Sequence, residues 1–135
     1  MVFRNELYFL SNMYPCKVAY NGYTYSCAES AFQAQKCPEL AHEFVPLDGF
    51  QAKKAGRKVP LRPDWESVKM DIMKDIVSAK FNQNSRLYEK LSRVDSDIVE
   101  ENTWNDTFWG VCRGKGQNHL GRILMQIRGN MKKSH

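Results

Sequence analysis

The feature that most constrains the fold of this chain is a long helical period from Trp65 to about Asn82. Pro63 and Asp64 stand just before it, as is typical of a helix start. Apolar side chains recur at the 3.6-residue period of a helix along one broad stripe, at Trp65, Val68, Ile72, Met73, Ile76, Val77 and Ala79. This stripe predicts a helix that contributes one face to the hydrophobic core.

A hairpin is predicted over Lys17–Ser26. Asn21-Gly22 stands there between alternating residues, and Asn-Gly is the preferred pair for a two-residue type I′ turn. In this register one face carries Val18, Tyr20, Tyr23 and Tyr25. We expect the tyrosine face to form part of the core or of a pocket wall.

Capping residues and apolar periods predict the remaining elements. A helix over Phe50–Lys58 is capped by Asp48, and Ser85–Arg93 forms another helix. Asp97–Glu100 is predicted to be a short strand. A last helix begins near Asn118 and buries Leu120, Ile123, Leu124, Ile127 and Met131.

The length and composition indicate a soluble globular protein. A chain of 135 residues accommodates one hydrophobic core and is short for two, so residues 1–135 are expected to form a single domain. No apolar run approaches the roughly 20 residues that span a bilayer, and the first residues lack the apolar core of a signal peptide. We therefore expect a cytoplasmic protein with no membrane partner.

The positive charge is concentrated in two tracts without acidic residues, 51–62 and 113–135. These tracts hold eleven of the twenty basic residues, although the net charge of the whole chain is only +5. A localised basic surface favours an anionic partner, either nucleic acid or a phosphorylated metabolite. Lys132 and Lys133, near the end of the second tract, are equally well interpreted as a solvated helix face.

The cysteines and histidines do not indicate a metal site. The four cysteines form no Cys-x-x-Cys pair, and the three histidines have no ligand spacing. Cys16 and Cys27 would face each other across an extended hairpin, so a disulfide between them is conceivable. Free thiols are favoured, because the chain shows no export signal.

A polar stripe on the helix predicted from Ser26 to about Lys36 is the first candidate for function. Glu29, Gln33 and Lys36 fall on one face at helical spacing. Ser26 and Glu29 also form the Ser-x-x-Glu pattern of a capping box, in which Glu29 needs no role beyond local hydrogen bonding. Spacing alone supports a capping residue and a catalytic acid equally.

The segment after Asn105 offers a second candidate carboxylate. Asp106 is either an ordinary turn aspartate or an acid of the site. Four aromatic residues either pack in the core or present a flat face to a nucleobase: Trp65, Trp104, Phe108 and Trp109.

Gly114-x-Gly116 precedes the last predicted helix. Glycines at this position let backbone amides approach an anion at a helix N-terminus, with Lys115 as a countercharge. The pair matches neither a P-loop nor a dinucleotide-binding fingerprint, and a lone glycine pair more often marks a turn.

Eight short motifs occur in one order along nearly the whole chain. Each is weak alone, but eight in sequence are very specific: Phe9-Leu-Ser11-Asn12-Met-Tyr14-Pro15, Glu29-x-x-Phe32-Gln33-Ala-Gln-Lys36, Ala55-Gly56-Arg57, Leu61-Arg62-x-Asp64-Trp65-x-x-x-Lys69, Lys80-Phe81-x-Gln83-Asn84, Val99-Glu100, Asn105-Asp106-x-x-Trp109-Gly110 and Gly114-Lys115-Gly116-x-Asn118-x-Leu120-Gly121. Together they resemble the YbiA-like N-glycosidases, also called the NADAR family.

The resemblance implies a compact, helix-rich α+β domain with a small antiparallel hairpin, which hydrolyses a carbon–nitrogen glycosidic bond on a ribose phosphate. It implies ribosylamino-pyrimidine intermediates of riboflavin synthesis or ADP-ribosylated guanine as substrates, with nucleic acid as a possible carrier of the latter. No step requires a cofactor or a metal.

The resemblance also implies the site residues. The catalytic pair is Glu29 and Asp106, and the substrate-binding residues are Asn12, Gln33, Lys36, Arg57, Trp65, Trp109, Gly114, Lys115, Gly116 and Asn118. One departure concerns substrate choice, because the family commonly has another glycine soon after Trp-Gly, where this chain has Val111-Cys112-Arg113.

The chemistry of N-glycoside hydrolysis fits these residue types. An oxocarbenium-like sugar needs a carboxylate near the anomeric carbon, a positioned water and a way to neutralise the departing base. Glu29 is the first choice as water activator, and Asp106 either shares that role or orients the ribose hydroxyls. Aromatic rings would hold the base, while Lys36, Arg57 and the 114–118 loop would anchor phosphate.

Two other functions are compatible with the sequence. A pI near 9.1 and the basic tracts suit a non-enzymatic nucleic-acid-binding module. A catalytically idle sensor of ADP-ribose or another NAD-derived ligand would carry the same motifs.

Overall fold

A computed structural model describes residues 1–133, with side chains described through Met131. The chain divides into two compact units. We call Asn12–Ser85 the hairpin unit, and Met1–Ser11 together with the chain from Arg86 onward the terminal unit. The expectation of a single domain over 1–135 stays a prediction.

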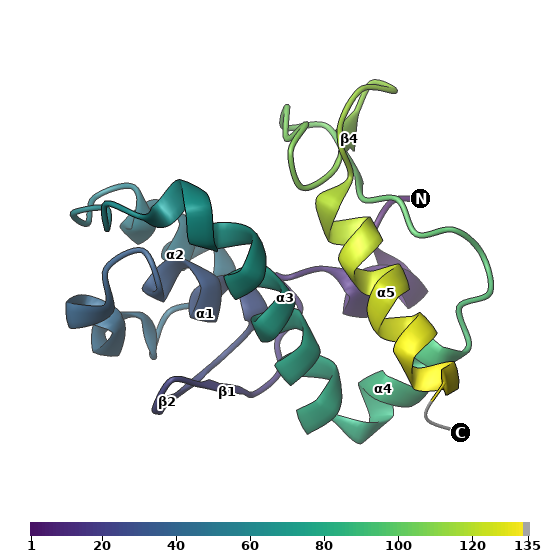
Figure 1. Ribbon diagram of the computed structural model, residues 1–135, viewed down its shortest axis with the longest axis horizontal. Coiled ribbons are helices and arrows are strands. Elements are labelled where there is room, and N and C mark those ends of the chain that lie inside the picture. Colours follow the sequence, from purple (N-terminus) through teal and green to yellow (C-terminus); the bar gives the residue numbers. More distant parts are fainter. Residues whose placement is uncertain (134–135) are drawn as a thin grey trace. The chain divides into compact units, whose positions relative to one another are not determined.

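The hairpin unit opens with the predicted hairpin. Strands β1 (Val18–Tyr20) and β2 (Tyr23–Tyr25) form this hairpin (Figure 1). They pair antiparallel in the expected register, which places Tyr20 opposite Tyr23. Asn21 and Gly22 both have positive φ, 48° and 91°, as a type I′ turn requires. The tyrosine face is not uniformly buried, because Tyr25 is 1% exposed and Tyr23 is 41% exposed.

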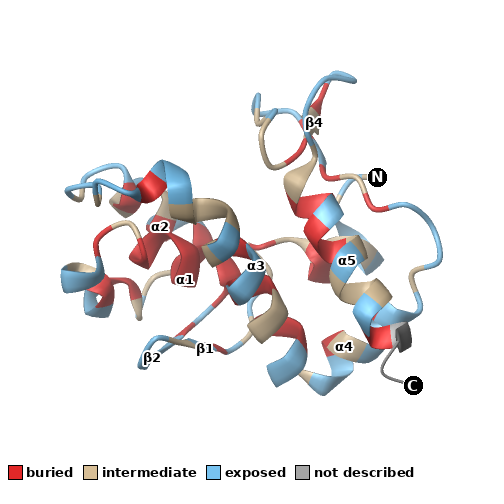
Figure 2. Ribbon diagram, viewed as in Figure 1, coloured by how far each residue is buried: buried red, intermediate tan, exposed pale blue. Residues whose placement is uncertain are grey.

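Helices make up the rest of the hairpin unit. They are α1 (Ala28–Ala34), a 3-10 helix (Pro38–Phe44), α2 (Gly49–Gly56) and α3 (Trp65–Gln83). An isolated helix as short as α1 is marginal in water, but all seven of its residues are buried, so packing stabilises it (Figure 2). The helices predicted over 50–58 and 65–82 are thereby confirmed, and so is the capping role of Asp48.

The buried face of α3 is narrower than the predicted stripe. Its buried residues are Trp65, Met73, Ile76, Val77, Lys80 and Phe81. Val68, Ile72 and Ala79 are only half-buried. The sequence period therefore located the helix correctly, while its neighbours decide which part of the stripe is fully covered.

The predicted capping box of Ser26 and Glu29 is wrong. The N-cap of α1 is Cys27, whose sulfur accepts a hydrogen bond from the Ser30 N–H at 3.5 Å. Ser26 instead donates its hydroxyl to the Leu47 carbonyl at 2.6 Å. A contact with a distant loop thus outweighs the local Ser-x-x-Glu pattern.

The terminal unit contains a 3-10 helix (Asn5–Leu10), α4 (Ser85–Ser92), β3 (Glu101–Asn102), β4 (Val111–Cys112) and α5 (His119–Lys133). Its core is formed by Phe9, Leu10, Leu87, Leu91, Ile98, Cys112, Leu120, Ile123, Leu124 and Met131. Ile127, predicted to be buried, is half-buried. The side chains of Lys132 and Lys133 lie outside the described residues.

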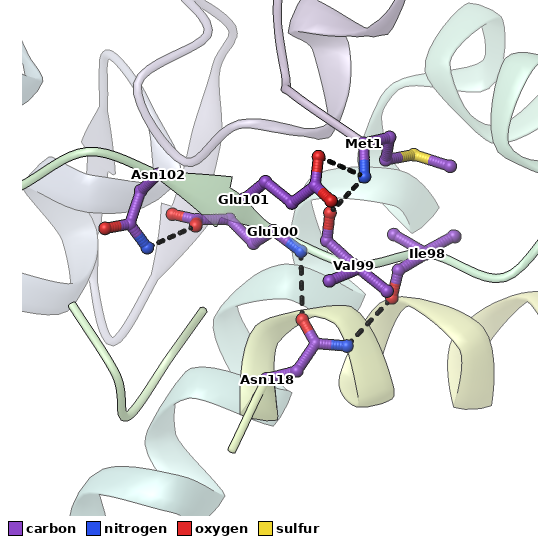
Figure 3. Close-up of polar contacts among 7 residues, drawn as sticks. All are labelled: Met1, Ile98, Val99, Glu100, Glu101, Asn102 and Asn118. Atoms are coloured by element: carbon purple, nitrogen blue, oxygen red, sulfur yellow. Dashed lines mark hydrogen bonds and ion pairs between the residues drawn. The ribbon is translucent and has the colours of Figure 1, made fainter. Parts of the chain in front are cut away.

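The predicted strand Asp97–Glu100 is wrong, because the side chain of Asn118, the residue just before α5, binds this segment. Asn118 accepts a hydrogen bond from the Glu100 N–H at 2.9 Å and donates to the Ile98 carbonyl at 3.0 Å (Figure 3). These backbone groups are satisfied without a partner strand. The strand begins one residue later, where Glu101–Asn102 pairs in parallel with Val111–Cys112.

Many short helices with two small two-stranded sheets form a helix-rich α+β fold, which confirms the predicted fold class. Over residues 1–133, no helix combines the length and apolar character needed to cross a membrane.

Candidate active site

Glu29 is a buried carboxylate held by its own helix. It is 9% exposed and stands in the first turn of α1. Its Oε2 accepts a hydrogen bond from Gln33 Nε2 at 2.7 Å, one helical turn further on. Its backbone N–H donates to the Asn12 carbonyl at 2.9 Å. With Cys27 as the cap, Glu29 is not needed to cap the helix, and its carboxylate is oriented by an amide.

Two buried amide oxygens belong to the residues that are hydrogen-bonded to Glu29. Asn12 Oδ1 and Gln33 Oε1 have no hydrogen-bond partner among the described residues, although these side chains are only 8% and 6% exposed. The other end of the Asn12 amide donates to the sulfur of Met73 at 3.5 Å. Leaving such an acceptor unpaired costs about 1–3 kcal/mol, so the Asn12 oxygen is suited to a ligand that brings O–H or N–H donors, whereas the Gln33 oxygen lies against Gly56.

Positive charge gathers around Lys36, the third residue of the predicted stripe. Burial is the main cause that lowers the pKa of Lys36, and the charges of Arg57, Lys53 and Lys69 lower it further, while Glu29 opposes them. These side chains are therefore near enough to act on one another. The charges that influence Lys36 are thus the Glu29 carboxylate and three cations, of which Lys69 is also paired with Glu66 at 2.7 Å.

Trp65 is covered rather than openly presented. It is 6% exposed, packs on Phe32 with ring centroids 5.0 Å apart, and has the Lys36 ammonium 6.0 Å from its ring centroid. A cation at this distance is attracted to the face of an indole. Of the two interpretations of Trp65, packing is the one that these contacts support.

In the terminal unit, Asp106 organises a turn. Its Oδ1 accepts hydrogen bonds from the N–H groups of Phe108 and Trp109, at 3.1 and 2.9 Å. Its own backbone N–H and carbonyl are both bound by the side chain of Asn102. The turn interpretation of Asp106 is confirmed, and a part in catalysis stays a prediction.

The aromatic residues after Asp106 form a cluster with the start of α5. Phe108 meets Trp109 edge-on with centroids 4.7 Å apart, and it lies 4.5 Å from the ring of His119. Trp109 is half-buried in this cluster. Stacking of Trp109 on a base stays a prediction.

The glycine pair forms a turn. Arg113 and Gly114 both have positive φ, and the backbone groups of Cys112 and Lys115 bond each other at 2.8 and 3.0 Å. The N–H groups of Gln117, Asn118, His119 and Leu120 also donate to carbonyls of the chain. These amides are thus used within the fold rather than offered to an anion, and the Lys115 side chain of this turn is exposed.

The predicted site residues accordingly fall into two sets. Asn12, Glu29, Gln33, Lys36, Arg57 and Trp65 belong to the hairpin unit, where hydrogen bonds and charges link most of them. Asp106, Trp109, Gly114, Lys115, Gly116 and Asn118 belong to the terminal unit. The side-chain amide of Asn118 is hydrogen-bonded to the 98–100 segment, where it has a structural role.

Comparison with known proteins identifies the family. Residues 2–132 match the NADAR domain. The chain belongs to the NADAR family. It is 36% identical over 122 residues to the N-glycosidase YbiA of Escherichia coli. The aligned region covers 85% of this chain and 74% of that protein. The NMR structure of E. coli YbiA matches with a TM-score of 0.85 at 31% identity, covering 99% of this chain and 85% of that one.

A second relative is a longer protein. The riboflavin biosynthesis protein VVA0006 of Vibrio vulnificus is 35% identical over 126 residues, which cover 89% of this chain but only 34% of that protein. The chain thus spans about a third of this relative's length. The predicted family and the prediction of an N-glycosidase enzyme are confirmed by these findings.

Three residues, two of them inside the eight motifs, escaped the sequence analysis as site residues. Lys53 and Lys69 act on Lys36, and the acid-free tract 51–62 was the only signal for the first of them. Glu100 is a buried carboxylate, 8% exposed, which accepts from Asn102 Nδ2 at 2.9 Å (Figure 3). It stands in the Val99-Glu100 motif, but no spacing in the sequence assigned it a contact. Among the described residues, no group of His, Cys, Asp or Glu side chains is arranged to hold a metal.

Proposed function

We propose that this protein hydrolyses the C–N glycosidic bond of a ribosyl phosphate compound, with Glu29 as the catalytic carboxylate. The observation that carries the proposal is the buried Glu29 carboxylate, which is bound by Gln33 at 2.7 Å and acts on Lys36, the lysine that Arg57, Lys53 and Lys69 also influence. A carboxylate in such a place is suited to stabilise a positive sugar while the phosphate is held nearby.

The reaction needs only water besides the substrate. The C–N bond breaks with its electron pair passing to the nitrogen of the base, which leaves an oxocarbenium-like ribose. Glu29 takes a proton from water as the hydroxyl adds to the anomeric carbon, the departing nitrogen takes a proton from solvent, and Glu29 returns its proton to solvent, so that one water is consumed overall. The Gln33 amide holds the Glu29 carboxylate in place throughout.

Binding groups of the hairpin unit have complementary roles in this proposal. The buried oxygen of Asn12 accepts a hydrogen bond from a ribose hydroxyl, while the Gln33 amide stays bound to Glu29. Lys36 and Arg57, with Lys53 and Lys69, attract the phosphate. A substrate that brings both hydroxyl donors and negative charge satisfies all of these groups at once.

The terminal unit supplies the remaining proposed roles. Asp106 orients ribose hydroxyls or shares the work of Glu29, through the carboxylate oxygen that does not cap Phe108 and Trp109. Trp109 stacks on the departing base, and Lys115 is a mobile countercharge. These assignments rest on the family motifs rather than on contacts with Glu29.

The proposed substrate is a ribosylamino-pyrimidine phosphate of the kind found in riboflavin synthesis. The name of the V. vulnificus relative, a riboflavin biosynthesis protein, supports this choice. ADP-ribosylated guanine, free or carried by nucleic acid, presents the same ribosyl C–N bond and is the second candidate.

Detection of the released base and ribose phosphate by mass spectrometry tests the proposal. Wild-type protein is expected to cleave at least one member of a panel of ribosylamino-pyrimidine phosphates and ADP-ribosyl-guanosine. Glu29→Gln keeps the size of the side chain but removes the base, so turnover is expected to fall by about 10²–10⁴-fold while substrate binding persists.

Two results would contradict the proposal. Near-normal turnover by Glu29→Gln removes Glu29 from the mechanism and leaves the activity standing. Tight binding of ADP-ribose without cleavage of any compound by wild type would indicate a ligand sensor.

A further inference from the structure

We propose that Gly56 is a positioning residue, which holds the Gln33 amide against the Glu29 carboxylate by allowing α2 to lie directly on α1. This inference rests on the proposed role of Glu29 and deepens it. It concerns how the carboxylate is kept in place, which neither the family nor the relatives' names address.

The space around Gly56 leaves no room for a side chain. A Cβ atom added to Gly56 would lie 2.0 Å from Gln33 Oε1 and 2.9 Å from Gln33 Cδ. Both distances are far inside van der Waals contact. Gly56 ends α2 without a positive φ, so the backbone itself does not require glycine. Alanine would favour the helix by about 1 kcal/mol, which leaves the contact with Gln33 as the reason for glycine.

The Gln33 side chain lies between the Glu29 carboxylate and Gly56. Its Nε2 donates to Glu29 Oε2 at 2.7 Å, while its Oε1 faces the Gly56 backbone and has no hydrogen-bond partner among the described residues. The amide is therefore confined on one side by the carboxylate and on the other by α2. A methyl group at Gly56 pushes the amide as a whole, including the nitrogen that binds Glu29.

The other end of α2 comes similarly close to α1. A Cβ added to Gly49 would lie 2.2 Å from the sulfur of Met13 and 3.4 Å from Glu29 Cβ. Gly49 and Gly56 stand about two turns apart on one face of α2. The helix thus meets α1 without side chains at both residues of the Glu29–Gln33 pair.

The kinetic test compares two Gly→Ala changes. Gly56→Ala is expected to lower kcat by about 10- to 100-fold with little change in KM, because the Glu29 carboxylate is displaced while the cations that bind the phosphate stay in place. Gly129→Ala, in α5, is the matched control, since an added Cβ there meets nothing within 4 Å. Its kcat is expected to equal that of wild type.

A double variant separates positioning from folding. Gln33→Ala removes the side chain that the new methyl group would strike, so Gly56→Ala in that background is expected to fold and to leave kcat at the Gln33→Ala value. A further loss of kcat in the double variant would overturn the proposal. So would a Gly56→Ala protein that turns over at the wild-type rate.

A readout without turnover distinguishes this proposal from the proposed function. In 15N NMR spectra, the Gln33 side-chain amide protons are expected to shift in both Glu29→Gln and Gly56→Ala and to keep their wild-type positions in Gly129→Ala. If wild type cleaves nothing, the proposed function fails while this shift still supports positioning. Unmoved Gln33 resonances in Gly56→Ala would overturn the positioning proposal whatever the activity.

Discussion

Lys80 illustrates at the residue scale how a charge is held inside the hairpin unit. It is 1% exposed, and its ammonium lies 5.1 Å from the ring centroid of Phe81 and 5.8 Å from that of Tyr14. Burial lowers the pKa of Lys80 from 10.5 to about 8, although the thiols of Cys16 and Cys27 oppose this shift. At neutral pH the folded state therefore carries a charged group that burial disfavours.

This shift predicts how stability depends on pH. Between about pH 8 and 10.5 the unfolded chain retains the Lys80 proton and the folded chain loses it, so this group's contribution to the free energy of unfolding rises with pH. A shift of this size corresponds to about 3 kcal/mol in total. Urea unfolding at pH 7 and pH 10.5, under reducing conditions, measures it.

Lys80→Met is the control, because it fills the same space without a titrating group. Wild type is expected to gain stability relative to Lys80→Met as the pH rises, since titrations other than those of Lys80 and the two thiols that interact with it are shared by both proteins. An equal difference between the two proteins at both pH values would show that burial of Lys80 does not shift its proton equilibrium.

At the scale of elements, the short helices depend on their ends and on their burial. α2 has a capping box in which the Asp48 side chain accepts from the Gln51 N–H at 2.8 Å and Gln51 Oε1 accepts from the Asp48 N–H at 2.9 Å. Both bonds satisfy amides that a helix start leaves without intrahelical partners. Since α2 carries Gly56 and precedes Arg57, its first turn supports the site.

Loss of this cap is expected to weaken the whole helix. Asp48→Ala removes the acceptor and is expected to lower the free energy of unfolding by about 1 kcal/mol, whereas Asp48→Ser retains an oxygen and loses much less. Chemical denaturation of the three proteins measures the difference. Equal losses for alanine and serine would mean that the charge of Asp48, rather than its hydrogen bond, stabilises α2.

At the scale of the whole molecule, the basic residues of one tract do not share one role. Lys53 acts on Lys36, whereas the exposed Lys58 of the same tract is not among the charges that shift Lys36. Phosphate affinity should follow the cations near Lys36, while non-specific nucleic-acid binding should follow total charge. The two interpretations of the basic surface thus make different predictions.

Lys53→Met and Lys58→Met form a matched pair for this test. Lys53→Met is expected to raise KM for a phosphorylated substrate several-fold and to flatten its dependence on salt, while Lys58→Met has little effect. Titration of the same proteins with mixed-sequence RNA is the companion measurement. Tight, steeply salt-dependent RNA binding that both changes weaken equally would favour the nucleic-acid-binding module.

The sequence by itself determined the local elements of this protein. The Asn21-Gly22 turn, the Asp48 cap and the period of α3 are all set by residues close together in the chain, and each prediction is confirmed. The bond between Glu29 and Gln33 also follows helical spacing. Such features could be predicted because backbone geometry alone brings their residues into contact.

Tertiary structure decided what depends on distant partners. Leu47 takes the Ser26 hydroxyl and leaves the cap to Cys27, and Asn118 occupies the backbone where a strand was predicted. No local pattern records that Gly56 lies against Gln33, or that Lys80 is buried beside thiols. Side-chain hydrogen bonds and close packing between separate segments decide these positions, because their free energies outweigh local preferences of about 1 kcal/mol.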